Sequence, residues 1–309
     1  MNNMSGVETA RDEARNALHI YQSRTGLSLR EVADRAGYAP QSIKQFSSGG
    51  RYGDSDGSLT AKALMDFFAA NPPPGPELPG KLYETECSGK IDQMLSYVGR
   101  GRWGTLYGPA GAQKSFVLEY RAAQAAQEAE PSIVYVECSP RLTPTALLRR
   151  IAAGLGAPYA QSREDILQSV LFTLRRRRAP VALVIDEAQH LYRGIDTLET
   201  VRDVGDKSHG KAGILICGNE RVLEIFAPRG GMYFEQWRSR IEQKSLRLLG
   251  LSRAEAREIV RAELGQLKPE TVEVLVGAPV RDPETKREYF SARRLFNAIR
   301  DFREKRGVS

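Results

Sequence analysis

The residues best suited to chemistry form a glycine-rich loop between a strand-like run, Trp103–Tyr107, and a helix-like run. The loop consists of Gly108, Pro109, Ala110, Gly111, Ala112, Gln113, Lys114 and Ser115. In this order of strand, loop and helix, successive backbone N–H groups converge on phosphate oxygens, and the helix directs its positive N-terminal end at the anion. The pattern predicts a phosphate-binding P-loop, in which Lys114 reaches the β- and γ-phosphates of ATP and Ser115 offers its hydroxyl to Mg²⁺.

One position departs from the usual G-x-x-x-x-G-K-[ST] spacing, because Gln113 stands where the second glycine is expected. A side chain there crowds the backbone if the residue must adopt an unusual φ/ψ pair. The alternative interpretation is a glycine-rich turn with a surface lysine. We expect the departure to affect the rate of hydrolysis more than the binding of nucleotide.

Two later apolar runs end in polar residues that suit the same site. The run Val181–Asp186 is followed by Glu187 and fits a central parallel strand buried on both faces. Asp186 can hold Mg²⁺ through water, and Glu187 can polarise the attacking water. Asn219, after the run Ile214–Cys217, can orient that water from the opposite side. Taken alone, these endings also fit exposed acids and a turn-forming asparagine; their position after the P-loop favours an ATPase site.

The elements that would position these residues alternate along the middle of the chain. Strand-like runs occupy Trp103–Tyr107, Ile133–Glu137, Val181–Asp186 and Ile214–Cys217, with helix-like stretches around 115–128, 143–155 and 163–178. Alternation of this kind predicts an α/β layer fold with a largely parallel sheet, and ligands in such folds bind at the carboxyl ends of the strands.

Composition divides the chain into four predicted segments. A proline-rich stretch breaks both helix and strand, so we expect a semi-stiff linker over 72–82. Before it, residues 1–71 form an all-α domain; after it, 83–250 form the nucleotide-binding core. The remaining segment, 251–309, is predicted to be a helical lid, since it opens on a helix cap and first turn.

A two-helix pattern lies within residues 27–46. Ser28 can cap the first helix, Ala33 is small where the helices would cross, Gly37 allows the turn, and Pro40 suits the first turn of the second helix. The residues expected to face outward from the second helix are Gln41, Ser42, Lys44 and Gln45. The pattern predicts a helix-turn-helix that meets a DNA groove or phosphates. Its neutral charge leaves a helical protein-contact module as the alternative.

The basic surplus of the chain lies outside this N-terminal part. The net charge is +7 and the pI about 9.3. Residues 1–71 hold 8 Lys/Arg against 8 Asp/Glu, residues 72–249 hold 24 against 20, and residues 250–309 hold 13 against 10. If DNA is bound, phosphate neutralisation is therefore expected at least partly from the ATPase part. The run Arg175 to Arg178 is interpreted first as a solvated helix cap that complements the helix dipole, and second as a DNA contact.

The cysteines and the apolar runs indicate a cytoplasmic protein. Cys87, Cys138 and Cys217 are far apart and form no CxxC pair, which predicts buried reduced thiols rather than a zinc site. No apolar run approaches the roughly 20 residues that span a bilayer. The N-terminal segment also lacks the pattern of a signal peptide, so no membrane partner is expected.

Taken together, these motifs resemble AAA+ ATPases, and within them the ATPase subunits of DNA transposition. Examples are the B protein of phage Mu, the C protein of Tn7-like elements and the helper ATPase of IS21-like elements. The resemblance rests on the P-loop, on Asp-Glu-Ala-Gln-His at Asp186 to His190, and on Cys-Gly-Asn at Cys217 to Asn219. It extends to the N-terminal helix-turn-helix and to a Tyr-Glu-Thr segment at 83–85 before the core.

The resemblance implies a role for each matching residue. Lys114 and Ser115 match the phosphate-binding pair, Asp186 and Glu187 the magnesium and water-activating acids, and Asn219 the sensor-1 position. ATP and Mg²⁺ are the implied cofactors.

Two arginine positions follow from the same resemblance. The stretch Trp237–Ile241 is similar to the one that carries the arginine finger, with Arg240 the first choice and Arg238 the second. The stretch Ser291–Asn297 is similar to the lid segment with the sensor-2 arginine, for which Arg294 fits best. A planar, permanent cation suits both roles because it meets phosphate oxygens bidentately, although each arginine also fits a surface salt bridge.

The predicted function is that of an ATP-dependent regulator of transposition. ATP binding would drive assembly into a ring or filament on duplex DNA without sequence preference, and this assembly would recruit and stimulate the transposase. Slow ATP hydrolysis, stimulated by DNA or by oligomerisation, would dismantle it. The alternatives are an AAA+ ATPase of secretion or replication loading, and a helix-turn-helix transcription regulator with a nucleotide-sensing module.

Overall fold

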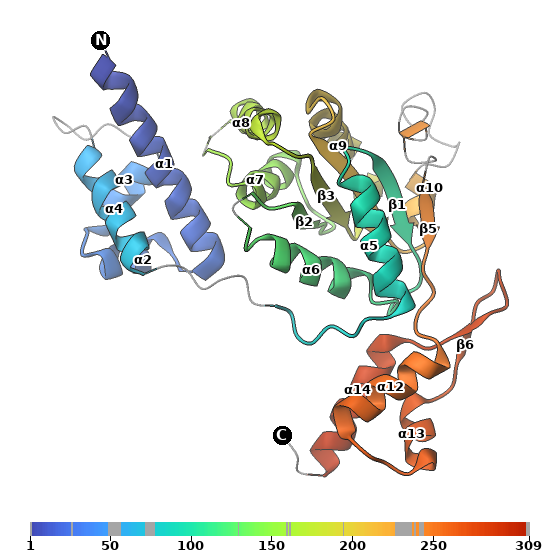
Figure 1. The fold of residues 1–309 in the computed structure, drawn as a ribbon. Helices are drawn as coiled ribbons and strands as arrows, with labels where there is room; N and C mark the ends of the chain where they lie inside the picture. Colours follow the sequence, from blue (N-terminus) through green and yellow to red (C-terminus); the bar gives the residue numbers. More distant parts are fainter. Residues whose placement is uncertain are drawn as a thin grey trace.

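The structure, a computed structural model, contains a helical N-terminal part, a sheet covered by helices, and a smaller C-terminal part (Figure 1). It describes residues 2–25, 27–48, 57–71, 78–128, 130–158, 160, 162–193, 195–225, 237, 239–240 and 244–306. Most of the proline-rich stretch, residues 72–77, and Arg238 of the expected arginine-finger segment lie outside these ranges.

The N-terminal part consists of the helices α1 (Asn2–Thr25), α2 (Leu29–Ala36), α3 (Pro40–Ser47) and α4 (Ser58–Ala70). Their buried side chains form one apolar cluster, which includes Leu18, Val32, Ile43, Phe46 and Leu64. Burial of these side chains holds the short α2 and α3, which would be marginal alone, against the longer α1 and α4.

The turn between α2 and α3 has the caps that the sequence predicts. The Ser28 hydroxyl accepts from the backbone N–H of Glu31, whose carboxylate accepts from the N–H of Ser28 at 2.7 Å. Gly37 ends α2 with a φ of 74°, and Pro40 occupies the first turn of α3. The end of α2, the turn after it and the start of α3 are therefore determined locally by these four residues.

The central sheet has five parallel strands in the order β2-β3-β4-β1-β5. They are β1 (Trp103–Tyr107), β2 (Ile133–Glu137), β3 (Val181–Asp186), β4 (Ala212–Gly218) and β5 (Ser245–Arg247). The largely parallel sheet is confirmed, and β3 and β4 are buried along their whole length, as central strands must be. The edge strand β5 was not predicted, because three residues are too few to show a period.

Helices cover both faces of the sheet. They are α5 (Glu86–Val98), α6 (Lys114–Ala125), α7 (Pro144–Leu155), α8 (Arg163–Arg176), the 3₁₀ helix η1 (Ala188–Arg193), α9 (Ile195–Lys207) and α10 (Val222–Ile225). Alternate residues of β3 enter two separate apolar clusters: Leu183 packs with α7, α8 and α9, whereas Val184 packs with α5 and α6. The core therefore has three layers, helix, sheet and helix, which confirms the predicted fold class.

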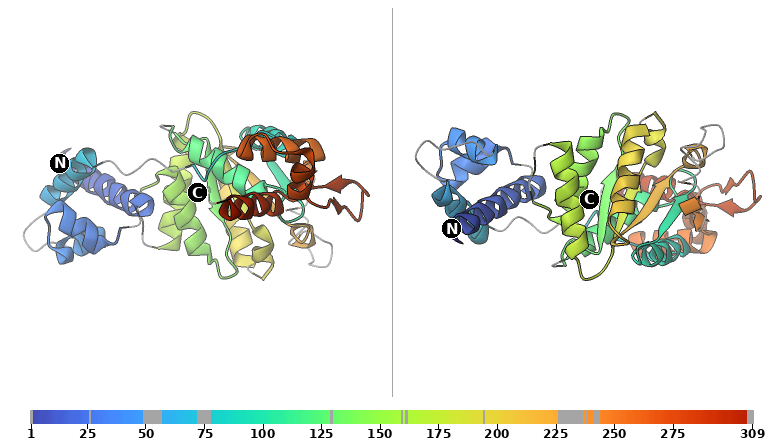
Figure 2. Two further views of the ribbon diagram at one scale, coloured as in Figure 1. Left: turned by 90° about the horizontal axis from the view of Figure 1, so that it is seen from below. Right: turned by 90° about the horizontal axis from the view of Figure 1, so that it is seen from above.

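The C-terminal part packs three helices, α12 (Arg253–Leu264), α13 (Pro269–Val276) and α14 (Ala292–Lys305), around its own apolar cluster. The helical lid was predicted without the antiparallel hairpin that β6 (Val280–Arg281) and β7 (Glu288–Tyr289) form between α13 and α14. Strands of two residues carry no periodicity in the sequence. The hairpin projects from the lid in Figure 1 and in both views of Figure 2.

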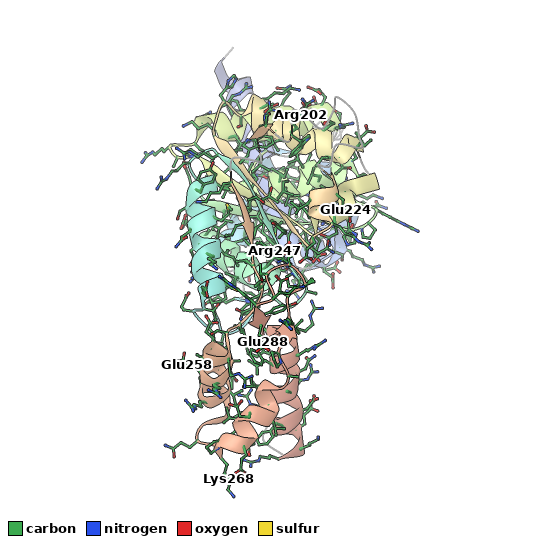
Figure 3. All side chains as sticks on the ribbon, turned by 90° about the vertical axis from the view of Figure 1, so that its right-hand side faces the viewer. Arg202, Glu224, Arg247, Glu258, Lys268 and Glu288 are labelled. Carbon is green, nitrogen blue, oxygen red and sulfur yellow. The ribbon has the colours of Figure 1, made fainter. Side chains whose placement is uncertain are left out.

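Arg247 of β5 joins the core to this hairpin, and it lies at the junction of the two parts in Figure 3. Its guanidinium donates to both carboxylate oxygens of Asp282, at 2.9 and 2.7 Å. It also lies 3.5 Å from a carboxylate oxygen of Glu220, which directly follows Asn219. The lid is thus tied to the end of β4.

Within the described ranges, no helix is both long and apolar enough to cross a membrane.

Candidate nucleotide-binding site

A cavity of about 690 Å³ lies where the carboxyl ends of the central strands meet the lid. The P-loop contributes the residues from Ala110 to Ser115 to its wall. Glu187, Gln189 and Asn219 line it from the strand ends, and Pro79 to Lys81 line it from the segment before α5. The lid contributes Glu263, Ala292, Arg293 and Phe296. A cavity of this size between a sheet edge and a second unit is a usual place for a small ligand.

The glycines of the P-loop are required by close contacts. A Cβ atom on Gly108, whose φ is 151°, would lie 1.9 Å from the carbonyl oxygen of Leu248. A Cβ atom on Gly111, whose φ is 86°, would lie 2.2 Å from Oγ of Ser291 at the start of α14. The backbone N–H of Ala292 in turn donates to the Gly111 carbonyl at 3.0 Å. The loop is therefore held between β5 and the lid in a conformation that glycine alone adopts readily.

Lys114 begins α6 and lies inside the loop. Its ammonium group donates to the carbonyl oxygens of Gly108 at 2.7 Å and Pro109 at 2.9 Å, and only 8% of the residue is exposed. A cation held at a helix N-terminus beside a curved loop is arranged to meet phosphate oxygens. Gly108 and Pro109 accept from this lysine but do not line the cavity themselves.

Gln113 adopts the left-handed backbone conformation, with a φ of 64° and a ψ of 2°. The unusual φ/ψ pair expected at this position is therefore present, and a glutamine occupies it. Its side-chain oxygen accepts from the Thr85 hydroxyl at 3.1 Å. Thr85 also caps α5, since its hydroxyl accepts from the N–H of Ser88 at 3.2 Å. The Tyr-Glu-Thr segment at 83–85 thus contacts the P-loop directly.

Asp186 is fully buried at the end of β3. Its carboxylate accepts from the Tyr135 hydroxyl at 2.8 Å and from the backbone N–H of Glu187 at 2.8 Å. Burial and the nearby charge of Asp186 raise the pKa of the Tyr135 phenol far above its usual range, so Tyr135 remains a hydrogen-bond donor. Asp186 lies behind the cavity wall rather than in it.

Glu187 and Asn219 are brought together by Gln189, a residue to which the sequence analysis assigned no role. The Gln189 amide donates to the Glu187 carboxylate, and its carbonyl oxygen accepts from the backbone N–H of Asn219 at 3.3 Å. His190 is more distant, with Nε2 3.9 Å from the same carboxylate. The signal in the sequence was the Asp-Glu-Ala-Gln run, in which Gln189 lies two residues after Glu187.

The lid arginine at the cavity is Arg293, not the predicted Arg294. Arg293 lines the wall beside Ala292, whereas Arg294 is exposed elsewhere on α14. Neighbouring residues of a helix point about 100° apart, so only one of the pair faces the cavity. Of the two arginines, Arg293 is therefore the one placed to meet a ligand in the cavity.

The other predicted site residues lie away from the cavity. Arg240 pairs with Asp206 at 3.0 Å and stacks over the Trp103 ring at the start of β1. Gln41, Lys44 and Gln45 are exposed on α3, and Ser42 is half-buried there. The structure does not bring these groups together with the P-loop of the same chain.

All three cysteines are buried and unpaired, two of them near the site. Burial raises the pKa of the Cys138 thiol to about 12 and that of Cys87 to about 11. Burial, reinforced by the charge of Asp186, raises the pKa of Cys217 well above its usual value. These thiols are therefore neutral packing groups at physiological pH.

The residues present suit ATP and Mg²⁺. The close-fitting glycines, the buried ammonium of Lys114 and the N-terminus of α6 converge at one end of the cavity. The Ser115 hydroxyl and the Asp186 carboxylate are hard oxygen donors of the kind that Mg²⁺ uses together with phosphate oxygens. Among the described residues, no cluster of three His, Cys, Asp or Glu side chains offers an all-protein metal site.

Comparison with known proteins supports this assignment of fold. Residues 99–226 match the family described as AAA domain. No curated protein matches the sequence. Among solved structures, Cdc6p from Pyrobaculum aerophilum is similar with a TM-score of 0.54 at 19% identity, over 75% of this chain and 65% of that one. The Aeropyrum pernix ORC2 protein is similar with a TM-score of 0.53 at 22% identity, over 75% and 66%.

The chain thus spans just under two thirds of the length of each of these proteins. Identities this low carry information about the fold alone. The match over residues 99–226, the parallel five-stranded order and the glycine-rich loop after β1 agree with one another. Residues 99–226 are accordingly similar to an AAA domain, and the chain has the P-loop AAA+ fold.

Proposed function

We propose that the protein binds and hydrolyses ATP, assembles on duplex DNA in the ATP-bound form, and recruits and stimulates a transposase. Hydrolysis would dismantle the assembly. The observation that carries the ATPase part is the shared cavity wall formed by Lys114, Glu187, Gln189, Asn219 and the lid. The transposition part rests on the motifs that the chain shares with the ATPase subunits of transposition.

The residues divide the work of hydrolysis in the following way. Lys114 leaves the two carbonyl oxygens that it now contacts and meets phosphate oxygens, while P-loop N–H groups bind the rest of the anion. Ser115 and Asp186 would hold Mg²⁺. When bound, ATP with Mg²⁺ supplies the phosphoanhydride bond that water breaks. Glu187 accepts a proton from that water, and Asn219 orients it.

Gln189 controls the Glu187 carboxylate in this scheme. In the present arrangement its amide occupies one carboxylate oxygen. A shift of Asn219 or of the backbone around it would move Gln189 and leave Glu187 able to accept the proton. Hydrolysis would then respond to the position of the end of β4, which Glu220 and Arg247 connect to the lid.

The test is electron microscopy of the protein with duplexes of unrelated sequence in ATP, a slowly hydrolysed ATP analogue, or ADP. We expect rings or filaments on every duplex with ATP and with the analogue, and none with ADP. Strand transfer into target DNA by the partner transposase should then rise when the assembled protein is added. Assembly that ignores the nucleotide, or binding confined to one sequence, would reject the proposal.

A second candidate is a role in replication loading. It is favoured by the fold similarity to Cdc6p and to the ORC2 protein, whose structure is described with ADPNP and ADP. This candidate predicts protection of one defined sequence in a footprinting experiment, whereas a transposition regulator protects unrelated duplexes equally.

A further inference from the structure

The edge of the sheet opposite the cavity carries a concentration of positive charge. Because all five strands are parallel, their N-terminal ends lie along one edge. The lid lies below the sheet in Figure 1, so this edge faces upward there, and the right-hand view of Figure 2 looks onto it.

Four adjacent strands are each preceded by basic residues at this edge. The residues, which we call the basic edge, are Arg100, Arg102, Arg175, Arg178, Lys211 and Lys244. Backbone hydrogen bonds show that they are neighbours: Val181 donates to the Lys211 carbonyl at 2.9 Å, and Ile214 to the Arg102 carbonyl at 3.1 Å. Thr105 donates to the Lys244 carbonyl at 3.0 Å. Four strands spaced about 4.8 Å apart give the row a width of about 15 Å.

No side chain of the basic edge lies within ion-pair distance of a carboxylate among the described residues. Arg175 donates instead to the Lys207 carbonyl at 2.9 Å, and Lys211 to the Arg177 carbonyl at 2.9 Å. Arg102 and Lys244 both lie over the Tyr97 ring, at 5.1 and 4.6 Å. Carbonyl oxygens and a ring hold these cations in place without cancelling their charge.

Two acids of α9, which ends beside Arg175, are already paired. Asp203 pairs with Lys207 at 3.0 Å, and Asp206 pairs with Arg240 at 3.0 Å. Two further arginines of the same run have other tasks. Arg176 stacks over Phe172, and Arg177 is 7% exposed and donates to the Pro131 carbonyl at 2.6 Å. Among the described residues, no ion pair cancels the charge of the six cations.

We propose that the basic edge binds the phosphodiester backbone of duplex DNA. The choice of duplex DNA as the ligand rests on the proposed function; the charge and the geometry of the site do not. A duplex presents a phosphate for about every 1.7 Å of its axis, so a row about 15 Å wide faces several phosphates at once. Contacts of this kind position a protein on DNA without reading its sequence.

The proposed DNA site and the nucleotide cavity lie at opposite ends of the strands. The cavity lies at the carboxyl ends of the strands and the basic edge at their N-terminal ends. Nucleotide turnover and DNA contact would thus occur on opposite edges of one sheet, and α8 and α9, which end at the basic edge, run between them. DNA bound there leaves the lid and the cavity accessible to ATP.

The experiment compares two triple variants of the full chain that lose equal charge. One carries Arg100→Gln, Arg102→Gln and Arg178→Gln at the basic edge. The control carries Arg261→Gln, Lys268→Gln and Lys305→Gln on exposed positions of the lid. Affinity for a labelled duplex of mixed sequence is measured with the slowly hydrolysed ATP analogue at several salt concentrations. Binding of a fluorescent ATP analogue verifies folding, and an Arg→Lys triple at the same edge positions keeps the charge.

We expect the edge triple to lose at least tenfold in duplex affinity and to lower the slope of log K against log salt by about 2.7. The lid triple and the Arg→Lys triple should bind as the unmodified chain does. Equal binding by the edge and lid triples would overturn the inference while leaving the proposed function intact. A further variant, Lys44→Gln, tests α3. If it loses duplex affinity while the edge triple does not, the inference is also overturned, because the DNA contact then lies on α3.

Three other outcomes are distinguishable. If the unmodified chain binds no duplex with any nucleotide, the proposed function fails and the inference fails with it. If the edge triple changes self-association in the absence of DNA while the lid triple does not, the basic edge faces another protein surface, and the inference is wrong. If the edge triple no longer binds nucleotide, the Arg→Lys triple decides: normal duplex binding by it supports a charge contact, and weakened binding rejects it.

Discussion

Gln113 and Glu187 both adopt positive φ angles at the cavity, 64° and 52°. For residues other than glycine, asparagine and aspartate, this conformation costs roughly 1–2 kcal/mol. Surrounding contacts maintain it: Gln113 accepts from Thr85, and Glu187 accepts from Gln189 and donates its N–H to Asp186. Strain of this kind at a candidate site aims side chains that a relaxed backbone would direct elsewhere.

The first prediction contrasts two replacements of Gln113. Gln113→Gly should keep ATP affinity within about threefold, because glycine adopts a φ of 64° without strain. Gln113→Val should weaken ATP binding and lower stability by about 1–3 kcal/mol, since a β-branched residue tolerates this conformation poorly. Titration with a fluorescent ATP analogue and denaturant unfolding measure both effects. Equal behaviour of the two variants would show that the backbone conformation of this residue is unimportant.

The second prediction concerns Glu187. Glu187→Gln should bind ATP normally and lose on the order of 10²–10⁴-fold in the rate of hydrolysis, because the amide cannot accept a proton from water. Phosphate release under single-turnover conditions measures the loss. Lys114→Ala is the comparison, since it should abolish binding itself. Normal turnover by Glu187→Gln would remove this residue from the mechanism.

At the scale of elements, the junction between β5 and the lid hairpin is electrostatic. Asp282 is buried, and its carboxylate also accepts from the backbone N–H and the hydroxyl of Thr285. The hydrogen bonds from Arg247, together with those from Thr285, hold the pKa of Asp282 well below its usual range. The lid is therefore fastened to the core by an ionised carboxylate.

The third prediction follows from the sign of that shift. The folded pKa of Asp282 is lower than the unfolded value of about 3.9, so the contact stabilises the protein fully above that pH and is lost as the pH falls below it. Asp282→Asn should therefore lower the thermal midpoint clearly at pH 7, and the effect should shrink progressively as the pH falls from about 3.9 toward the folded pKa. Glu284→Gln, which alters an exposed partner of the same arginine, is the control and should have little effect at either pH. An Asp282→Asn effect that does not change with pH would contradict the assignment.

At the scale of the whole molecule, the position of Arg240 bears on assembly. Arg240 lies over Trp103 at the first residue of β1, whereas the P-loop follows the last residue, four steps of about 3.3 Å away. The P-loop of the same chain therefore begins roughly 13 Å along the strand from the residue over which Arg240 lies. If Arg240 acts on phosphate as an arginine finger, it does so in the cavity of a neighbouring copy.

The fourth prediction tests this arrangement by mixing two inactive variants. Lys114→Ala removes nucleotide binding, and Arg240→Ala removes the proposed finger. In mixed assemblies some interfaces combine an intact Lys114 with an intact Arg240 from the next copy, so ATPase activity should reappear on mixing. Arg202→Ala, which alters an arginine on α9, serves as the control for nonspecific loss. Failure of the mixture to regain activity, with assembly intact, would reject action between copies.

The sequence by itself was enough to predict the features that depend only on residues close together in the chain. The small residues and spacing of the loop between β1 and α6, the apolar runs of β3 and β4, and the caps at Ser28 and Gly37 all depend on neighbours within a few residues. The three-layer fold followed from the alternation of these units. Alternate residues of β3 are buried in two separate apolar clusters, one on each face of the sheet, which agrees with that expectation.

Only the tertiary structure decided the contacts that join distant segments. Arg293 rather than Arg294 reaches the cavity because α14 docks on the P-loop through the N–H of Ala292, and docking sets which side of a helix faces inward. Gln189 contacts Glu187 and Asn219 because β3 and β4 are neighbours in the sheet. The basic edge exists because parallel strands align the residues that precede them. Such contacts depend on how distant helices and strands pack together, and the spacing of residues within one element does not reveal that packing.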